Sequence, residues 1–165
     1  MTIILIAQVP SFAQKCKFDK DETDPFSKEQ VRITKLTRIS GFPAWWIKLE
    51  QKGSKYSMTL MMNQIKKIND VIPKGTEIMT KLQDGSVFSL EVPKDVVPNF
   101  NVEGSMIVTQ WVITIELTEE HLKKLSSSPI ELIRTEIANE EYNMAKAKAG
   151  GVKSIMNFAS CLISN

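Results

Sequence analysis

The chain has 165 residues, of which 42% are apolar and 24% are charged, with 7 glycines and 7 prolines. These values are typical of one globular domain, and they exclude a collagen-like rod, a disordered chain and a two-domain enzyme. The net charge is +2, and 21 basic residues are interspersed with 19 acidic ones. Because a nucleic-acid partner requires clustered basic charge, we expect none.

The first 13 residues read as a secretory signal peptide. An apolar run and a proline are followed by Ser11-Phe12-Ala13, a pattern typical of cleavage before Gln14. No basic residue precedes the run, so the true start could lie upstream of Met1; an N-terminal strand that stays in the fold is the alternative. We expect residues 1–13 to be removed, residues 14–165 to form a single globular domain, and the protein to be periplasmic or secreted. No later stretch has the 18 or so continuous apolar residues of a membrane span, so the mature chain should lack one.

The only two cysteines, Cys16 and Cys161, lie near the two ends of the predicted mature chain. An even number of cysteines in an exported protein favours a disulfide, here one that joins the termini. If the chain is not exported, the alternative is two buried free thiols.

The densest acidic stretch is residues 19–24, Asp-Lys-Asp-Glu-Thr-Asp. Calcium binds several carboxylate oxygens, but this stretch lacks the glycine and the distal glutamate of a helix-loop-helix calcium loop. Asp24 before Pro25 is equally consistent with the start of a helix. We therefore expect no metal site and no cofactor.

Alternating apolar residues predict strands through the middle of the chain. Residues 31–40 predict a strand with a bulge, because the apolar phase slips between Ile33 and Leu36. Two hairpins are predicted, over residues 45–62 with a turn at Gly53-Ser54 and over residues 76–92 with a two-residue turn at Asp84-Gly85. Further strands are predicted over residues 106–116 and 130–137, whereas residues 93–105 predict a long loop.

Two helices are predicted late in the chain. Thr118 fits the N-cap of a short helix near residues 118–126, with Glu119 and Glu120 in its first turn. Residues 141–162 show helical spacing, although Gly150-Gly151 would kink this helix or split the segment into a strand end and a shorter helix. The predicted fold is α+β and mainly antiparallel, with about seven strands in a sandwich or open barrel and the C-terminal helix packed on the sheet.

Three segments carry a resemblance to other proteins: residues 75–90 (GTEIMTKLQDGSVFSL), 111–125 (WVITIELTEEHLKKL) and 129–136 (PIELIRTE). Together they resemble small exported domains of unknown function from Bacteroidota-type bacteria, and the Ser-Phe-Ala-Gln junction resembles signal peptides of that group. The resemblance covers about half the chain. It implies an exported domain and no particular activity, cofactor or catalytic residue.

No set of catalytic residues can be assembled from the sequence. His121 is the only histidine, so any Ser/His/Asp or Cys/His arrangement must use it. We expect His121 on the surface of the short charged helix instead. One histidine and two distant cysteines do not give the closely spaced ligands of a zinc site.

Aromatic residues are the candidate binding residues. Trp45 and Trp46 are neighbours in a predicted strand, so their side chains should point to opposite faces. If one lies in the core, the other could stack on a sugar or anchor a protein partner, unless the C-terminal helix or residues 93–105 cover it. Phe100 in the predicted loop is a third candidate.

These observations predict an exported, non-catalytic binding or interaction domain of the bacterial cell envelope, with an envelope protein or a glycan as its partner. One alternative is a small hydrolase whose carboxylates are far apart in the sequence, which requires two acidic groups within about 5–10 Å in a shared cleft. Another is a structural or assembly component that pairs through a sheet edge.

Overall fold

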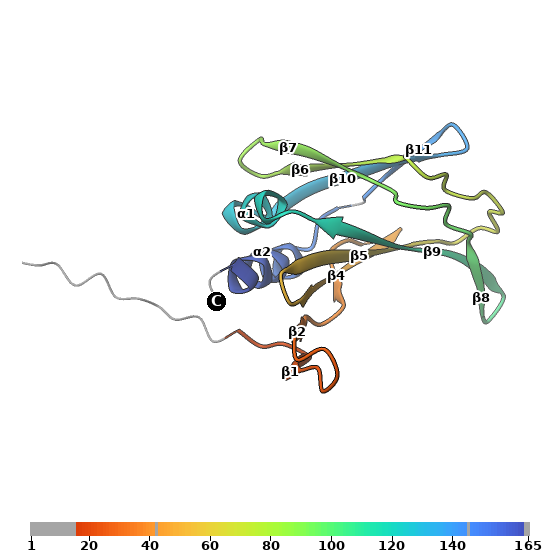
Figure 1. Ribbon diagram of the computed structural model, residues 1–165. Helices are drawn as coiled ribbons and strands as arrows, with labels where there is room; N and C mark the ends of the chain where they lie inside the picture. Colours follow the sequence, from red (N-terminus) through yellow and green to blue (C-terminus); the bar gives the residue numbers. More distant parts are fainter. Residues whose placement is uncertain (1–15, 42, 145, 164–165) are drawn as a thin grey trace, which may run out of the picture.

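The computed structural model describes residues 16–41, 43–144 and 146–163, so the predicted signal peptide lies outside the described residues. Two antiparallel sheets face each other, and two helices lie at one end of them (Figure 1). The seven-stranded sheet has the spatial order β1 (Lys20–Thr23), β2 (Gln30–Ile33), β4 (Ala44–Lys52), β5 (Lys55–Gln64), β9 (Met106–Leu117) and β8 (Asn99–Glu103), with β3 (Thr37–Arg38) paired to β4. The four-stranded sheet has the order β11 (Glu140–Asn143), β10 (Ile130–Ile137), β6 (Glu77–Leu82) and β7 (Val87–Glu91).

The helices are α1 (Glu119–Ser127) and α2 (Ala149–Ile163), and α2 packs against α1, β3, β4 and β10. The predicted fold class is therefore confirmed: α+β, mainly antiparallel, with a C-terminal helix packed on the sheet. The part of the chain that the structure describes forms eleven strands instead of the predicted seven or so, because several strands are only two to five residues long. Among the described residues, no helix is both long and apolar enough to cross a membrane.

The core lies between the two sheets and is built by strand alternation. Trp45, Ile47 and Leu49 of β4 and Trp111 and Ile113 of β9 are all fully buried. One continuous apolar cluster joins these side chains to the inner face of the four-stranded sheet and to both helices. Burial of alternate residues thus fixes which face of each strand points outward.

Both predicted hairpins are present. Gly53 supplies the positive φ of 57° in the tight turn between β4 and β5. The β6–β7 turn is longer than predicted: the N–H of Leu82 donates to the carbonyl of Ser86, and the N–H of Gly85 donates to the carbonyl of Leu82. Only one position of this three-residue loop has a positive φ. It is Gly85, with a φ of 88°, which glycine adopts readily because it has no Cβ.

Two predicted elements are corrected, and a third takes one of its two predicted forms. Residues 31–40 form two short strands, β2 and β3, and the predicted phase slip falls at Thr34, whose hydroxyl accepts the N–H of Leu49. Residues 93–105 are not all loop, because Asn99–Glu103 pairs with β9. Residues 141–162 divide into the end of β11 and the shorter helix α2, which is the second of the two predicted outcomes.

Two local predictions about helix starts had different outcomes. Thr118 is the N-cap of α1, and its hydroxyl accepts the N–H of His121. Asp24 does not start a helix: its carboxylate accepts the N–H groups of Phe26 and Ser27 in a turn before β2. These bonds to backbone N–H groups lower the pKa of Asp24.

The predicted disulfide is present. Cys16 is bonded to Cys161, with 5.9 Å between the two Cα atoms. The bond joins the segment before β1 to the last turns of α2, so it closes a loop that spans nearly all the described residues.

The two buried tryptophans of the large sheet should differ in their sensitivity to substitution. Trp111 Nε1 donates to the carbonyl of Asp70 at 3.1 Å, whereas the buried Nε1 of Trp45 has no hydrogen-bond partner among the described residues. Phenylalanine removes similar ring volume at both sites, but only Trp111→Phe also breaks a hydrogen bond. We expect Trp111→Phe to lower the free energy of unfolding by about 1 kcal/mol more than Trp45→Phe. Urea unfolding followed by circular dichroism measures this difference, and an equal or reversed order would contradict it.

Candidate functional site

The outer face of the four-stranded sheet carries a row of acidic side chains. Ile78, Thr80 and Leu82 of β6 point into the core, so Glu77, Met79 and Lys81 point outward. Strand pairing places residues of the outer face opposite one another across the sheet. Glu77 pairs with Glu91, Glu136 pairs with Glu141, and the β6–β10 register continues to place Glu136 opposite Glu77. We call Glu91, Glu77, Glu136 and Glu141, one from each strand, the glutamate row.

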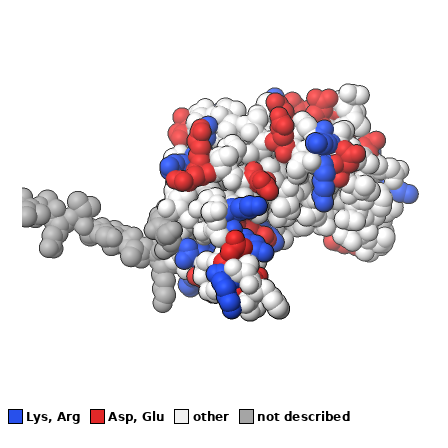
Figure 2. Space-filling model, viewed as in Figure 1, with Lys and Arg blue, Asp and Glu red and all other residues white. Residues whose placement is uncertain are grey.

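The glutamate row is only partly neutralised. Glu141 Oε2 lies 3.2 Å from Arg134 Nη1, whereas Glu77, Glu91 and Glu136 form no ion pair with any residue in the described ranges. Like charges opposite each other destabilise a sheet, so this row costs stability unless a cation approaches it. In Figure 2, acidic side chains gather along the upper edge of the molecule, where Figure 1 places β7 and β11.

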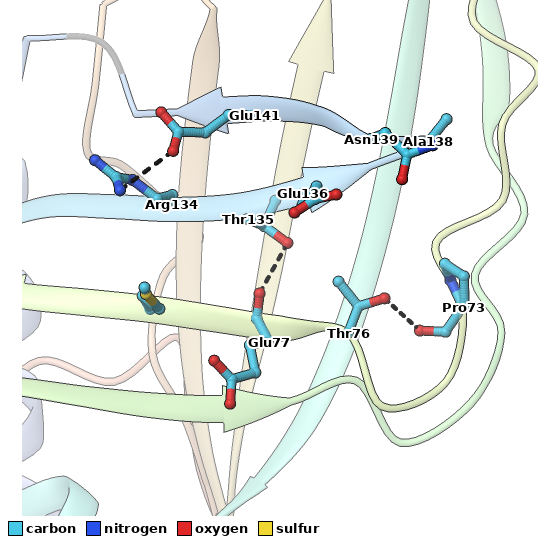
Figure 3. A pocket seen from close by; sticks show the side chains of 10 residues that line it. Pro73, Thr76, Glu77, Arg134, Thr135, Glu136, Ala138, Asn139 and Glu141 are labelled. Carbon is cyan, nitrogen blue, oxygen red and sulfur yellow. Dashed lines mark hydrogen bonds and ion pairs between the residues drawn. The ribbon is translucent and has the colours of Figure 1, made fainter.

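A pocket of about 520 Å³ opens beside the glutamate row. Figure 3 shows Arg134 and Glu141 pointing toward each other from neighbouring strands, and the hydroxyl of Thr135 directed at the backbone of Glu77. The lining residues are Pro73, Thr76, Glu77, Met79, Arg134, Thr135, Glu136, Ala138, Asn139 and Glu141. Three of the four glutamates of the row therefore line this one pocket.

Hydrogen bonds hold the walls of the pocket in place. Arg134 Nε donates to Asn143 Oδ1 at 3.0 Å, which fixes the guanidinium group together with its ion pair to Glu141. Thr135 Oγ1 donates to the carbonyl of Glu77 at 3.1 Å. On the far side, the β10–β11 turn bends tightly because Ala138 and Asn139 have φ values of 50° and 63°. These contacts hold the polar walls of the pocket in one arrangement.

The hollow continues along the same face of the sheet. A second cavity of about 200 Å³ shares Met79 and Arg134 with the first and is otherwise lined by Lys81, Val87 and Leu132. The face therefore passes from an acidic end to a more apolar end, with Arg134 at the boundary.

Tyr142 anchors the edge strand that carries Glu141. Its ring packs edge-on against Trp111, with 6.2 Å between the centroids, and its hydroxyl donates to Glu140 Oε2 at 3.1 Å. The pKa of Tyr142 is raised to about 12, mainly because the hydroxyl is partly buried and also because it donates a hydrogen bond to Glu140. The hydroxyl therefore stays protonated at neutral pH and serves as a structural donor.

His121 has a structural role at the start of α1. Its Nδ1 accepts the N–H of Thr118, and its ring stacks on Phe88 with 5.7 Å between the centroids. The pKa of His121 is lowered, mainly because the ring is partly buried and also because the positive charge of Lys124 is nearby. Within residues 16–41, 43–144 and 146–163, no three His, Cys, Asp or Glu side chains are grouped so as to hold a metal ion.

The three aromatic residues predicted from the sequence do not form one site. Trp45 is in the core, whereas Trp46 points to the outer face of the large sheet and is half-buried. The guanidinium of Arg38 lies over the Trp46 ring, with 5.5 Å between Cζ and the ring centroid. Phe100 pairs with Thr109, which lies on the same face of β9 as the buried Trp111, so Phe100 and Trp46 lie on opposite faces. Neither aromatic side chain lines the pocket.

The residues of the pocket were missed for two reasons: the order in space of the predicted strands over residues 76–92 and 130–137 was unknown, and Glu141 lay in a segment predicted to be helical. A signal was nevertheless present: Glu77, Glu91 and Glu136 each occupy an outward position beside a buried apolar residue. Only the strand order β11-β10-β6-β7 turns these separate positions into one row. No family model, curated protein or solved structure matches the chain.

Proposed function

We propose that the protein is an exported, non-catalytic binding domain of the bacterial cell envelope, which holds a basic, extended segment of a partner protein on the outer face of its four-stranded sheet. The observation that carries this proposal is the glutamate row beside a pocket whose walls are held by hydrogen bonds. Ammonium or guanidinium groups of the partner would relieve the repulsion between neighbouring carboxylates, so complex formation would be favoured by charge complementarity.

Export is supported by two independent features. The Cys16–Cys161 disulfide is of a kind that persists in oxidising compartments, and residues 1–13 have the pattern of a signal peptide. A periplasmic or secreted location follows from them as part of the proposal.

A hydrolase that uses carboxylates is the second candidate, because Glu136 and Glu141 are directly opposite each other in one pocket. Cβ atoms in such positions lie roughly 5 Å apart, so the two carboxyl groups can reach the separation of about 5–10 Å that glycoside hydrolysis uses. However, Glu141 is engaged by Arg134 and also accepts a hydrogen bond from Asn143 Nδ2 at 2.6 Å. With one carboxylate already held by two donors, the geometry favours binding over general acid catalysis.

Binding can be tested with a fluorescein-labelled peptide of alternating lysine and valine, whose anisotropy should rise on addition of the full-length protein. The double variant Glu77→Gln/Glu136→Gln removes two unpaired charges of the row without changing side-chain size. We expect it to bind the peptide at least about tenfold more weakly, which corresponds to about 1.4 kcal/mol. Raising the salt concentration should weaken binding to the wild type in the same direction.

The matched control is Glu119→Gln/Glu120→Gln on α1, where the same charge is removed from glutamates already paired with Lys123 and Lys124. This control should keep most of the affinity. Equal losses in both double variants would reduce the effect to net charge and overturn the proposed site. Saturable binding of a neutral glycan that Glu77→Gln/Glu136→Gln abolishes would overturn the protein partner, and turnover of a glycoside that Glu136→Gln abolishes would favour the hydrolase.

A further inference from the structure

The strand at the outer edge of the large sheet, β8, has little of the protection that edge strands usually have. Lysine, proline and charged side chains normally discourage pairing at a sheet edge. The edge strand β1 reads Lys-Asp-Glu-Thr and the edge strand β11 reads Glu-Glu-Tyr-Asn, so both carry charge. In contrast, β8 reads Asn-Phe-Asn-Val-Glu, with its single charge at Glu103 beside the turn, and it pairs with β9 alone among the described strands. Figure 1 shows it at the far end of the sheet from the helices.

One face of the β8–β9 hairpin is apolar and uncovered. Phe100 is 43% exposed, Val102 is 74% exposed, and Ile107, which is paired with Val102, is 39% exposed. These side chains lie on the same face of the sheet as the core residue Trp111. Lys67 Nζ lies 5.9 Å from the centroid of the Phe100 ring and covers only part of it. The hairpin thus extends the core face beyond the four-stranded sheet.

The register of the hairpin decides which backbone groups face the free edge. Glu103 and Met106 close the two-residue turn at Gly104-Ser105, and such a closing pair is hydrogen-bonded in both directions. Backbone groups of successive residues point to alternate edges of a strand. The N–H and C=O groups of Phe100 and Val102 therefore point away from β9, toward the free edge.

The sequence of β8 is complementary to itself about its middle residue. If two copies pair antiparallel with Asn101 on a two-fold axis, Phe100 of each copy lies opposite Val102 of the other. Both such pairs bring together the residues whose backbone groups face the free edge, which gives four interchain hydrogen bonds. Glu103 then faces Asn99, so no like charges meet.

We propose that β8 is a homodimerisation strand, through which two copies of this protein join their large sheets by antiparallel β8–β8 pairing centred on Asn101. The occupant of the edge is a second copy because a closed two-fold contact satisfies every outward backbone group of Phe100 and Val102. It also gathers Phe100, Val102 and Ile107 of both copies into one apolar cluster across the axis. This inference uses a different face of the molecule from the proposed partner site.

Cysteine cross-linking tests the register directly. Two Asn101 residues on the axis would have Cα atoms about 4.5 Å apart, within disulfide range. Two Asn99 residues would lie about 13 Å apart, because each is two residues from the axis. Under mild oxidation at about 50 μM protein, Asn101→Cys should form a covalent dimer and Asn99→Cys should stay monomeric, which denaturing non-reducing electrophoresis separates. Asn99→Cys is a matched control because it is the same substitution on the same strand and face.

Sedimentation velocity of the full chain without added cysteines provides the second measurement. The wild type should show a concentration-dependent dimer that Val102→Lys abolishes, since a lysine at the edge leaves a buried charge opposite Phe100. Val87→Lys at the edge strand of the other sheet is the control and should keep the dimer. A wild type that is monomeric up to about 500 μM, or equal cross-linking of Asn99→Cys and Asn101→Cys, would overturn the proposal.

Discussion

Loss of the Cys16–Cys161 disulfide is expected to lower the free energy of unfolding by up to about 5 kcal/mol. The two cysteines are 145 residues apart, so the bond restricts nearly the whole unfolded chain, and its entropic contribution grows with the length of the closed loop. In a domain of this size, the melting temperature should fall by roughly 10–20 °C.

Cys16→Ser is the better single substitution, because Cys161 is buried and a hydroxyl in its place would add a separate cost of desolvation. The double variant Cys16→Ser/Cys161→Ser shows whether the remaining thiol matters. Calorimetry of the oxidised protein, the reduced protein and the two variants compares their melting temperatures, with reduction verified by mass spectrometry. The reductant should not affect the double variant. A reduced wild type that melts within about 1 °C of the oxidised form would contradict the prediction.

Local patterns predicted the parts of the fold that depend on neighbouring residues. Alternation assigned Trp45 to one face of β4 and Trp46 to the other, and Thr118 was identified as a helix N-cap from the acidic residues after it. The disulfide was predicted because the chain was expected to be exported and its two cysteines can pair in only one way. Each of these inferences needs only residues close in sequence or a count.

Features that depend on strand order could not be predicted. The segment containing β8 looked like a loop because prolines and polar residues surround the only two apolar side chains of the strand, Phe100 and Val102, and its pairing with β9 is a tertiary contact. The glutamate row likewise requires that β10 lie beside β6, although about 50 residues separate these strands in the chain. Chain order alone does not specify this neighbour, so the candidate pocket emerged only from the folded arrangement.

The glycine pair in α2 shows how a tertiary contact can reverse the sign of a local expectation. Helix propensity alone predicts that alanine at either Gly150 or Gly151 stabilises the helix by up to about 1 kcal/mol. A Cβ at Gly150 would have no atom within 4 Å outside its own helix, so that expectation stands there. A Cβ at Gly151 would lie only 2.1 Å from the carbonyl oxygen of Arg38 and 3.2 Å from the Cα of Ile39.

We therefore expect Gly151→Ala to lower the free energy of unfolding by about 3 kcal/mol, whereas Gly150→Ala raises it by about 0.5–1 kcal/mol. The clash at Gly151 cannot be relieved by a side-chain rotation, because both atoms belong to the backbone beside β4. The start of α2 cannot shift freely either, since the N–H of Lys148 donates to the carbonyl of Ile39 at 2.8 Å. Urea unfolding followed by tryptophan fluorescence gives both values under identical conditions. Two alanine variants that change stability in the same direction would show that α2 can move away from β3, and that Gly151 is not what allows this close packing.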